Sequence, residues 1–190
     1  MIYNNMNKKD SKNKKLTVFD ESHYKSDNGF STYIWGPCMW QFLHIMTFNY
    51  PVKPTPKQKK DYKKFLELLQ VTLPCGKCRE NYAMNIKADD TKLTMNVMKD
   101  RESLSKWLCK LHNKINKQIG KNTETPYDEC RDFYEQFRAR CTKTKGSQHG
   151  GCTIPIHKGI KSKTVLRIVP RNSKVPTLKI NKKCLCKRKN

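Results

Sequence analysis

The stretch LPCGKC at residues 73–78 decides how the rest of this 190-residue chain is organised. Its two cysteines, Cys75 and Cys78, are separated by two residues, so they can close a small, reversible disulfide ring that exchanges with thiols of another protein. Pro74 ends the helical pattern before it, and we expect a new helix to begin at or near Cys75. By itself, a CxxC motif is equally consistent with redox activity, with zinc binding and with chance.

The position of the motif at a helix start favours exchange chemistry. There the Cys75 sulfur would lie near unpaired backbone N–H groups and the positive end of the helix dipole. Lys77 and Arg79 add positive charge nearby. This environment favours the thiolate, which is the form of cysteine that attacks disulfides.

A histidine-bearing helical stretch stands on each side of the motif. Upstream, Trp40 and His44 are four residues apart and therefore share one helix face. Downstream, His112 and Asn116 have the same spacing, with Asn113 beside them. Such ring-shaped and amide groups could hold a flat, polar-edged ligand between two helices. The alternative is that Trp40 packs in the core and His44 bonds to a backbone group.

Apolar residues at helical spacing predict four helices and a short fifth between residues 30 and 141, with no period-two alternation. We therefore expect an all-α domain. The apolar positions are Trp40, Leu43 and Phe48 in the first helix, Tyr62, Phe65, Leu66 and Leu69 in the second, and Leu104, Leu108, Leu111, Ile115 and Ile119 in the fourth.

Capping patterns mark several helix ends. Thr55, Pro56 and Gln58 form a capping box with proline at the first helical position. The Thr125-Pro126-Tyr127-Asp128-Glu129 run repeats the cap, proline and acid pattern and opens the fifth helix, which runs through Phe133 and Phe137. Pro51 closes the first helix, and Gly120 ends the fourth.

Charge and composition divide the chain into three parts. Residues 1–29 are polar and unpatterned, so we expect a flexible arm. Residues 30–140 form the expected domain, and residues 141–190 form a basic tail. Of the net charge of +24, the last 49 residues carry +14 and hold no acid. Glycines and prolines break any long helix there, and short strands are predicted at 164–169 and 177–180.

No stretch has the roughly 20 apolar residues of a transmembrane helix, and the N-terminus lacks the apolar segment of a secretory signal. We therefore expect no membrane contact, and the cytoplasm is the default location. The nine cysteines nonetheless indicate a disulfide framework, a metal site or redox chemistry. Because nine is odd, at least one thiol is free or pairs between chains.

Two further cysteine pairs are candidates for disulfides. A Cys109–Cys130 bridge would close a loop of moderate length and stabilise the fold by about 3 kcal/mol, whereas the alternative is two buried thiols. Cys184 and Cys186 lie in a run of lysine and arginine near the C-terminus. A strained CxC disulfide there would be reducible, and the alternatives are a metal-binding or an unpaired couple.

Together these motifs resemble the Erv/ALR family of FAD-linked sulfhydryl oxidases over about residues 30–140. The resemblance rests on WQFLH at 40–44, YP at 50–51, PCGKC at 74–78 and WLCKLHNKIN at 107–116, followed by IGK at 119–121. It implies a four-helix bundle with a short fifth helix, usually a homodimer, that binds FAD. The Lys/Asn-rich composition is similar to that of members encoded by large DNA viruses, which would place the protein in host cytoplasm or in a virion.

The resemblance also implies a role for each matching residue. Cys78 would lie beside the flavin, Cys75 would be the interchange sulfur, and Cys184 with Cys186 would be a shuttle dithiol. Two substrate thiols and O2 would give a protein disulfide and hydrogen peroxide, with no metal. Cys109–Cys130 would be the structural bridge. The implied cofactor-binding residues are Gly36, Trp40, His44, Cys109, His112, Asn113, Ile115, Asn116, Lys121 and either Phe137 or Tyr134.

Three features depart from the family pattern. The 20 residues between Cys109 and Cys130 are more than usual, so we expect an enlarged loop on the adenine side. The basic tail lies outside the shared domain. Cys38, Cys141 and Cys152 have no implied role, although Cys141 with Cys152 could close a short loop and leave Cys38 as the odd thiol.

A zinc-binding module is the main alternative. Cys75, Cys78, Cys109 and His112 offer three sulfurs and one nitrogen in two closely spaced pairs, which zinc accepts. With the basic tail, such a module would bind nucleic acid through phosphate contacts. The tail could also contact nucleic acid, or an acidic partner, in an oxidase.

Overall fold

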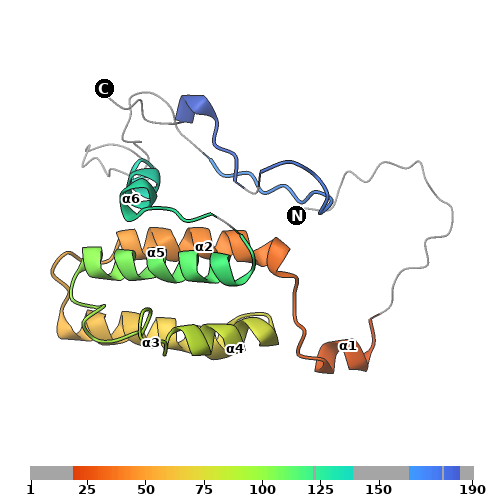
Figure 1. The fold of residues 1–190 in the computed structure, drawn as a ribbon, viewed down its shortest axis with the longest axis horizontal. Helices are drawn as coiled ribbons and strands as arrows, with labels where there is room; N and C mark the ends of the chain where they lie inside the picture. The colour runs from red at the N-terminus through yellow and green to blue at the C-terminus, as the bar shows by residue number, and fades with distance from the viewer. Residues whose placement is uncertain (1–18, 122, 139–162, 177, 185–190) are drawn as a thin grey trace, which may run out of the picture.

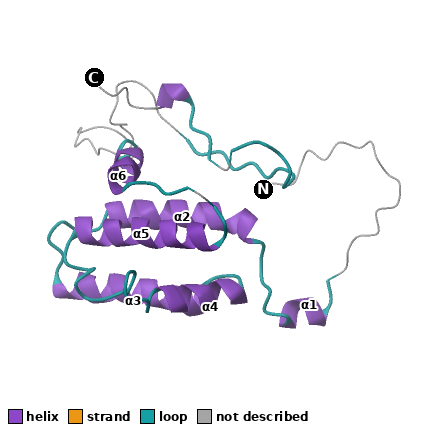
Figure 2. Ribbon diagram, in the orientation of Figure 1, coloured by secondary structure: helices purple, strands orange, loops and turns teal. Residues whose placement is uncertain are grey.

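In this computed structural model, residues 19–121, 123–138, 163–176 and 178–184 are described, and within them every regular element is helical (Figure 2). The helices are α1 (Glu21–Lys25), α2 (Thr32–Phe48), α3 (Pro56–Thr72), α4 (Gly76–Asn85), α5 (Arg101–Gln118) and α6 (Tyr127–Glu135), with one 3-10 turn at Lys182–Cys184. The predicted all-α class is confirmed. None of the described helices is both long and apolar enough to cross a membrane.

The four long helices pack as two pairs. α2 contacts α5 and α3 contacts α4, and the short α6 lies across α2 and α5 (Figure 1). This is the predicted four-helix bundle with a short fifth helix. α5 supplies the centre of the core, because Leu104, Leu108 and Leu111 are wholly buried along one stripe.

The long loop between α4 and α5 is tied to the bundle by buried polar groups. The Tyr50 hydroxyl donates to the Met98 carbonyl at 3.0 Å, and the Trp107 indole N–H donates to the Thr91 carbonyl at 2.9 Å. Since an unpaired polar group in the interior is costly, these bonds fix the course of the loop over the core.

Local sequence signals place two helix starts correctly and a third one residue away. The Thr55–Gln58 capping box is present at α3, and Cys75 is the N-cap of α4. At α6, however, the N-cap is Pro126 rather than the predicted Thr125, and it makes no side-chain capping bond. The backbone of Thr125 is instead held by Asn113 of α5.

Some predictions of core positions and strands are wrong. Phe65 is 37% exposed and turns its ring toward Phe42 of α2, and Ile119 is exposed because α5 has already ended at Gln118. The segment 164–169 and the described part of 177–180 contain no strand. Exposed apolar residues there, such as Val165 and Leu166, have no sheet to join.

The two ends of the described chain both reach the bundle. Residues 19–29, which we assigned to a polar arm, contain α1, and Asp20 caps this helix. In the C-terminal extension, the Arg171 guanidinium lies 4.8 Å from the centre of the Tyr33 ring and donates to its hydroxyl at 3.2 Å. Cys141, Cys152 and Cys186 lie outside the described residues.

Candidate active site

The CxxC motif forms a disulfide at the start of α4. Cys75 and Cys78 are bonded, with their Cα atoms 5.2 Å apart. The Cys78 backbone N–H donates to the Cys75 sulfur at 3.2 Å, so this sulfur occupies the capping position that an Asp or Ser side chain usually takes. Both cysteines are half-exposed. A disulfide in this position is accessible to an incoming thiol.

A second feature is a cavity of about 340 Å³ where α2, α5 and α6 meet. Its walls are formed by aromatic and imidazole rings, by side-chain amides, and by Cys109 and Cys130. The lining residues are His44, Cys109, His112, Asn113, Asn116, Thr125, Glu129, Cys130, Phe133, Tyr134 and Leu178.

Flat side chains are stacked at this cavity in two layers. The Trp40 ring lies 3.9 Å from the His112 ring and nearly parallel to it, and His44 stacks on Tyr134 at 4.7 Å. His44 Nε2 and His112 Nδ1 are 2.9 Å apart, so one imidazole donates to the other across α2 and α5. The predicted groups from the two helices are therefore in direct contact and form a continuous set of flat rings beside the cavity.

The surroundings of His112 keep its imidazole uncharged. Burial, then the neighbouring His44, then Lys121 lower the pKa of His112 to about 3. His112 is consequently neutral near pH 7 and can accept a hydrogen bond. Lys121 follows Gly120, whose φ of +74° forms the turn after α5.

Asn113 holds the loop that closes the cavity. Its side-chain amide donates to the Thr125 carbonyl at 2.9 Å and accepts from the Thr125 N–H at 3.1 Å. This pair of bonds fixes the approach to α6 and thus the position of the aromatic residues that follow.

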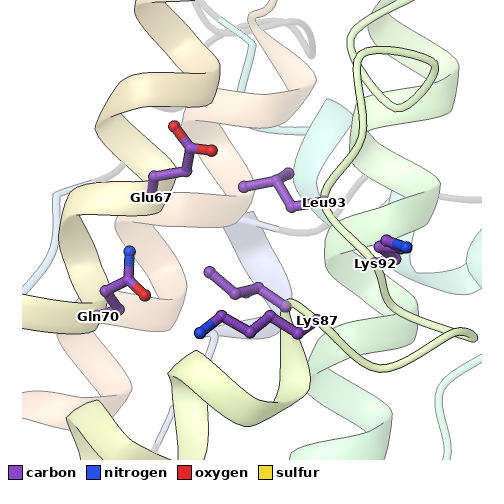
Figure 3. A pocket seen from close by; sticks show the side chains of 6 residues that line it. Glu67, Gln70, Lys87, Lys92 and Leu93 are labelled. Carbon is purple, nitrogen blue, oxygen red and sulfur yellow. The ribbon is translucent and has the colours of Figure 1, made fainter.

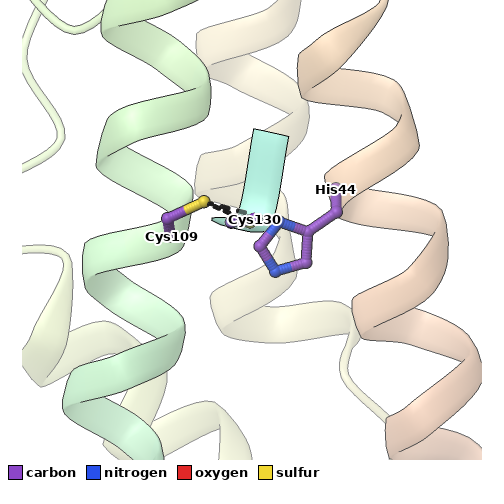
Figure 4. Close-up of side chains that lie close together, drawn as sticks. All are labelled: His44, Cys109 and Cys130. Carbon is purple, nitrogen blue, oxygen red and sulfur yellow. Dashed lines mark hydrogen bonds between the residues drawn. The ribbon is translucent and has the colours of Figure 1, made fainter. Parts of the chain in front are cut away.

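Cys109 and Cys130 meet beside His44 (Figure 4). Their sulfurs are 2.6 Å apart, and the His44 Nδ1 atom is 3.7 Å from the Cys130 sulfur. Both residues are buried, and little movement separates this pair from a disulfide. The bridge therefore stays a prediction that the geometry favours.

The structure gathers about half of the predicted cofactor-binding residues at the cavity wall. His44, Cys109, His112, Asn113 and Asn116 line it. Four others are not among the lining residues, namely Gly36, Trp40, Ile115 and Lys121. Of the two late aromatic candidates, Tyr134 lines the cavity, whereas Phe137 packs edge-on against Phe133 with ring centres 5.9 Å apart. The roles of all these residues remain predictions.

Sequence reasoning missed several lining residues. Phe133 lies three residues after Cys130 on α6, so its helical spacing from the cysteine was an available signal. Thr125 and Glu129 could have been found only from the turn of the chain between α5 and α6. Leu178 comes from the C-terminal extension, and no local pattern connects it to the bundle.

A smaller cavity of about 190 Å³ lies between α3 and the loop after α4 (Figure 3). Its walls include Glu67, Lys87 and Lys92, and it contains none of the predicted site residues. The chemistry suggested by the sequence therefore belongs to the larger cavity and to the disulfide.

A helical bundle with a CxxC disulfide at one helix start and a ring-lined cavity between three helices combines a group that can exchange disulfides with a site for a flat ligand. Residues 37–139 match the model of the Erv1 / Alr family. The chain belongs to this family, as its motifs predicted.

Known members resemble this chain over the same region. A protein of Acanthamoeba polyphaga mimivirus named "Probable FAD-linked sulfhydryl oxidase" is 38% identical over 102 residues, which cover 54% of this chain and 69% of that protein. The mitochondrial FAD-linked sulfhydryl oxidase of Saccharomyces cerevisiae is 32% identical over 101 residues, covering 53% and 48%. The chain thus spans about half the length of the yeast relative.

Among solved structures, the FAD binding domain of yeast Erv1 is 28% identical to this chain. It superimposes with a TM-score of 0.47, and the match covers 53% of this chain and 90% of that domain.

The zinc alternative is not supported. Cys75 and Cys78 are bonded to each other, while the close neighbours of Cys109 are Cys130 and His44. Among the described residues, His44, Cys109 and Cys130 are the group whose potential ligand atoms lie within 4.8 Å of one another. The four predicted zinc ligands are therefore not assembled into one site.

The lowered pKa of His112 makes folding stability depend on pH. Because the native state keeps His112 neutral down to about pH 3 while the unfolded chain protonates near 6.5, stability is complete above pH 6.5 and falls as the pH drops below it. Because of His112, we expect the free energy of unfolding to fall by about 2 kcal/mol when the pH is lowered from 7 to 5. Urea denaturation at the two pH values measures this loss. It should be smaller in His112→Asn. Equal losses in the two proteins would contradict the assignment.

The Cys109–Cys130 bridge can be tested by stability as well. If the bridge forms, Cys130→Ser should lower the free energy of unfolding by about 3 kcal/mol, because it releases the closed loop. Cys38→Ser, which alters an exposed thiol, should change it by less than about 0.5 kcal/mol. Mass spectrometry after alkylation of the unfolded, unreduced protein provides the direct reading. Labelling of both Cys109 and Cys130 there would rule out the bridge.

Proposed function

We propose that this chain is an FAD-dependent sulfhydryl oxidase that forms disulfides in protein substrates and produces hydrogen peroxide from O2. The observation that carries the proposal is the half-exposed Cys75–Cys78 disulfide at the N-terminus of α4, in a bundle that also holds a ring-lined cavity. The names of the family relatives support the same activity.

The residues at the cavity fit a flavin dinucleotide. Stacked Trp40, His112, His44 and Tyr134 match a flat heteroaromatic group, and side-chain amides match its polar edges. The Lys121 side chain, exposed at the rim beside His112, suits phosphate oxygens. We therefore expect these residues to hold FAD. Bound FAD supplies two-electron chemistry that side chains lack, accepting electrons from a dithiol and passing them to O2.

The protein's own step is a thiol–disulfide exchange. A substrate thiolate attacks one sulfur of the Cys75–Cys78 disulfide, which breaks that bond and forms a mixed disulfide. The second substrate thiol then attacks the mixed disulfide and releases an oxidised substrate. The substrate has lost two electrons and two protons, and Cys75 and Cys78 have become a dithiol. Because the Cys75 sulfur accepts the Cys78 N–H at the start of α4, a thiolate formed there is stabilised.

The proposal includes the predicted shuttle and the predicted homodimer. Cys184 is half-exposed in the turn at Lys182–Cys184, so it is accessible to other thiols, but Cys186 lies outside the described residues. For the dimer, α2 and α3 expose neighbouring apolar residues on one face, with the Phe42 and Phe65 rings 6.3 Å apart. The exposed residues of this face are Ile34, Phe42, Ile45, Phe65, Leu68 and Val71. A patch of this kind is typical of an interface between subunits.

Two predictions about surroundings remain open to experiment. In the described part of the tail, Lys163, Arg167, Lys174, Lys179 and Lys182 are exposed, which is consistent with contacts to nucleic acid or to an acidic partner. The cytoplasmic or virion location stays a prediction.

The oxidase proposal is tested with a dithiol substrate under air. We expect the purified protein to absorb near ~450 nm and to consume oxygen, and we expect Cys75→Ser and Cys78→Ser each to lower peroxide production at least about a hundredfold. Cys38→Ser is the matched control and should keep the activity. Full turnover in Cys78→Ser, or a protein that stays colourless after incubation with FAD, would contradict the proposal.

The dimer is tested by placing a charge on the shared face of α2 and α3. Phe42→Glu should convert the protein to a monomer, with the dimer dissociation constant rising at least about tenfold, because an unpaired carboxylate would be buried. Size-exclusion chromatography with light scattering reports the mass. Val52→Glu, at an exposed loop position, should stay dimeric. A monomeric unmodified protein would rule out this interface.

A further inference from the structure

A segment preceding α2 is clamped onto the active-site loop. The Gly76 N–H donates to the Asp27 carbonyl at 3.0 Å, and the Phe30 N–H donates to the Pro74 carbonyl at 2.7 Å. We call residues 27–30 the N-terminal clamp. Its two backbone bonds reach the residues immediately before and after Cys75, so the clamp holds the interchange loop from both sides.

The contact is so close that it requires glycine on both partners. At Gly29, where φ is +63°, a Cβ atom would overlap the Pro74 carbonyl and would lie 3.0 Å from the Cys75 Cα. At Gly76, a Cβ atom would overlap the Asp27 carboxylate. The Asp27 side chain therefore lies directly over the first residue of α4, next to Cys75.

The clamp also brings a negative charge to the start of α4. The first turn of α4 contains no acid, and Asp27 supplies one from another part of the chain. Its carboxylate pairs with Arg79, whose guanidinium also donates to the Leu73 carbonyl at 2.7 Å. Among the described residues of this helix start, the other nearby charges are Lys77 and Glu80, which pair with each other at 3.0 Å.

We propose that Asp27 is a positioning residue of the Cys75–Cys78 pair, and that its carboxylate biases this pair toward the disulfide. Reduction adds two electrons and two protons to the disulfide, and the dithiol then ionises at the helix start. A carboxylate fixed there neutralises the Arg79 guanidinium, which would otherwise stabilise a Cys75 thiolate, and it leaves the neutral disulfide unaffected. Because a stabilised reduced form makes a dithiol pair more oxidising, Asp27 makes this pair a weaker oxidant of substrates and a stronger electron donor.

The inference rests on the proposed function only for the direction in which electrons travel, and the thiol–disulfide equilibrium can be measured without any activity. The test uses the full chain and the variants Asp27→Asn and Glu80→Gln. Both variants remove one carboxylate near α4, but only the first removes the clamp charge. Each protein is equilibrated without oxygen in glutathione buffers, and the oxidised fraction of Cys75–Cys78 is determined by alkylation and mass spectrometry.

We expect Asp27→Asn to shift the equilibrium toward the dithiol by about threefold to tenfold, the size expected for one charge removed within a turn of the helix. A tenfold shift corresponds to about 30 mV. In a Cys78→Ser background, alkylation of Cys75 should also extend to lower pH when Asp27 is replaced. Glu80→Gln should stay within about twofold of the unmodified protein. Gly29→Ala, which displaces the clamp but keeps its charge, should shift the equilibrium in the same direction as Asp27→Asn.

An Asp27→Asn protein with an unshifted equilibrium and an unshifted alkylation profile would overturn the inference, even if its stability fell, since the clamp would then be only structural. Equal shifts in Asp27→Asn and Glu80→Gln would also overturn it. If the protein makes no peroxide but Asp27→Asn still shifts the equilibrium, the proposed function is contradicted while this inference stands.

Discussion

The packing of α2 against α5 is the contact on which the rest of the molecule depends. It buries the Leu104, Leu108 and Leu111 stripe, and it brings His44 within 2.9 Å of His112 although 68 residues separate them. The same contact gives α6 a surface to lie on, and α6 then carries Cys130 and Tyr134 to His44. Core burial and site assembly are therefore one event, since the apolar side of each helix positions its polar residues at the cavity.

The redox-active loop depends on a different kind of constraint. α4 begins at the CxxC motif because Cys75 caps it, and the capping bond uses a sulfur of the Cys75–Cys78 disulfide. The start of the helix and the disulfide are thus coupled at one atom. The N-terminal clamp adds backbone bonds and a carboxylate at this point, where small changes in charge alter the stability of a thiolate.

Burial and neighbouring charges together set the protonation state of His112. His112 stays uncharged because it is buried beside His44 and Lys121, and a neutral ring can accept a hydrogen bond and stack on Trp40. The apolar face of α2 and α3 has the opposite character, because it exposes large apolar side chains. The bundle thus has a ring-lined cavity at one place and an exposed apolar face at another.

The sequence by itself determined the all-α class, the family and the start of α4 at the CxxC motif, because helical periodicity, capping patterns and a CxxC at a helix start are local signals. It misjudged Phe65, since helical spacing cannot say whether a face is covered by the core or left exposed. Only the tertiary structure decided that Leu178 reaches the cavity and that Asp27 reaches the start of α4. The contact between Asp27 and Arg79 spans 52 residues, and such contacts follow from how helices pack, which no short stretch of sequence encodes.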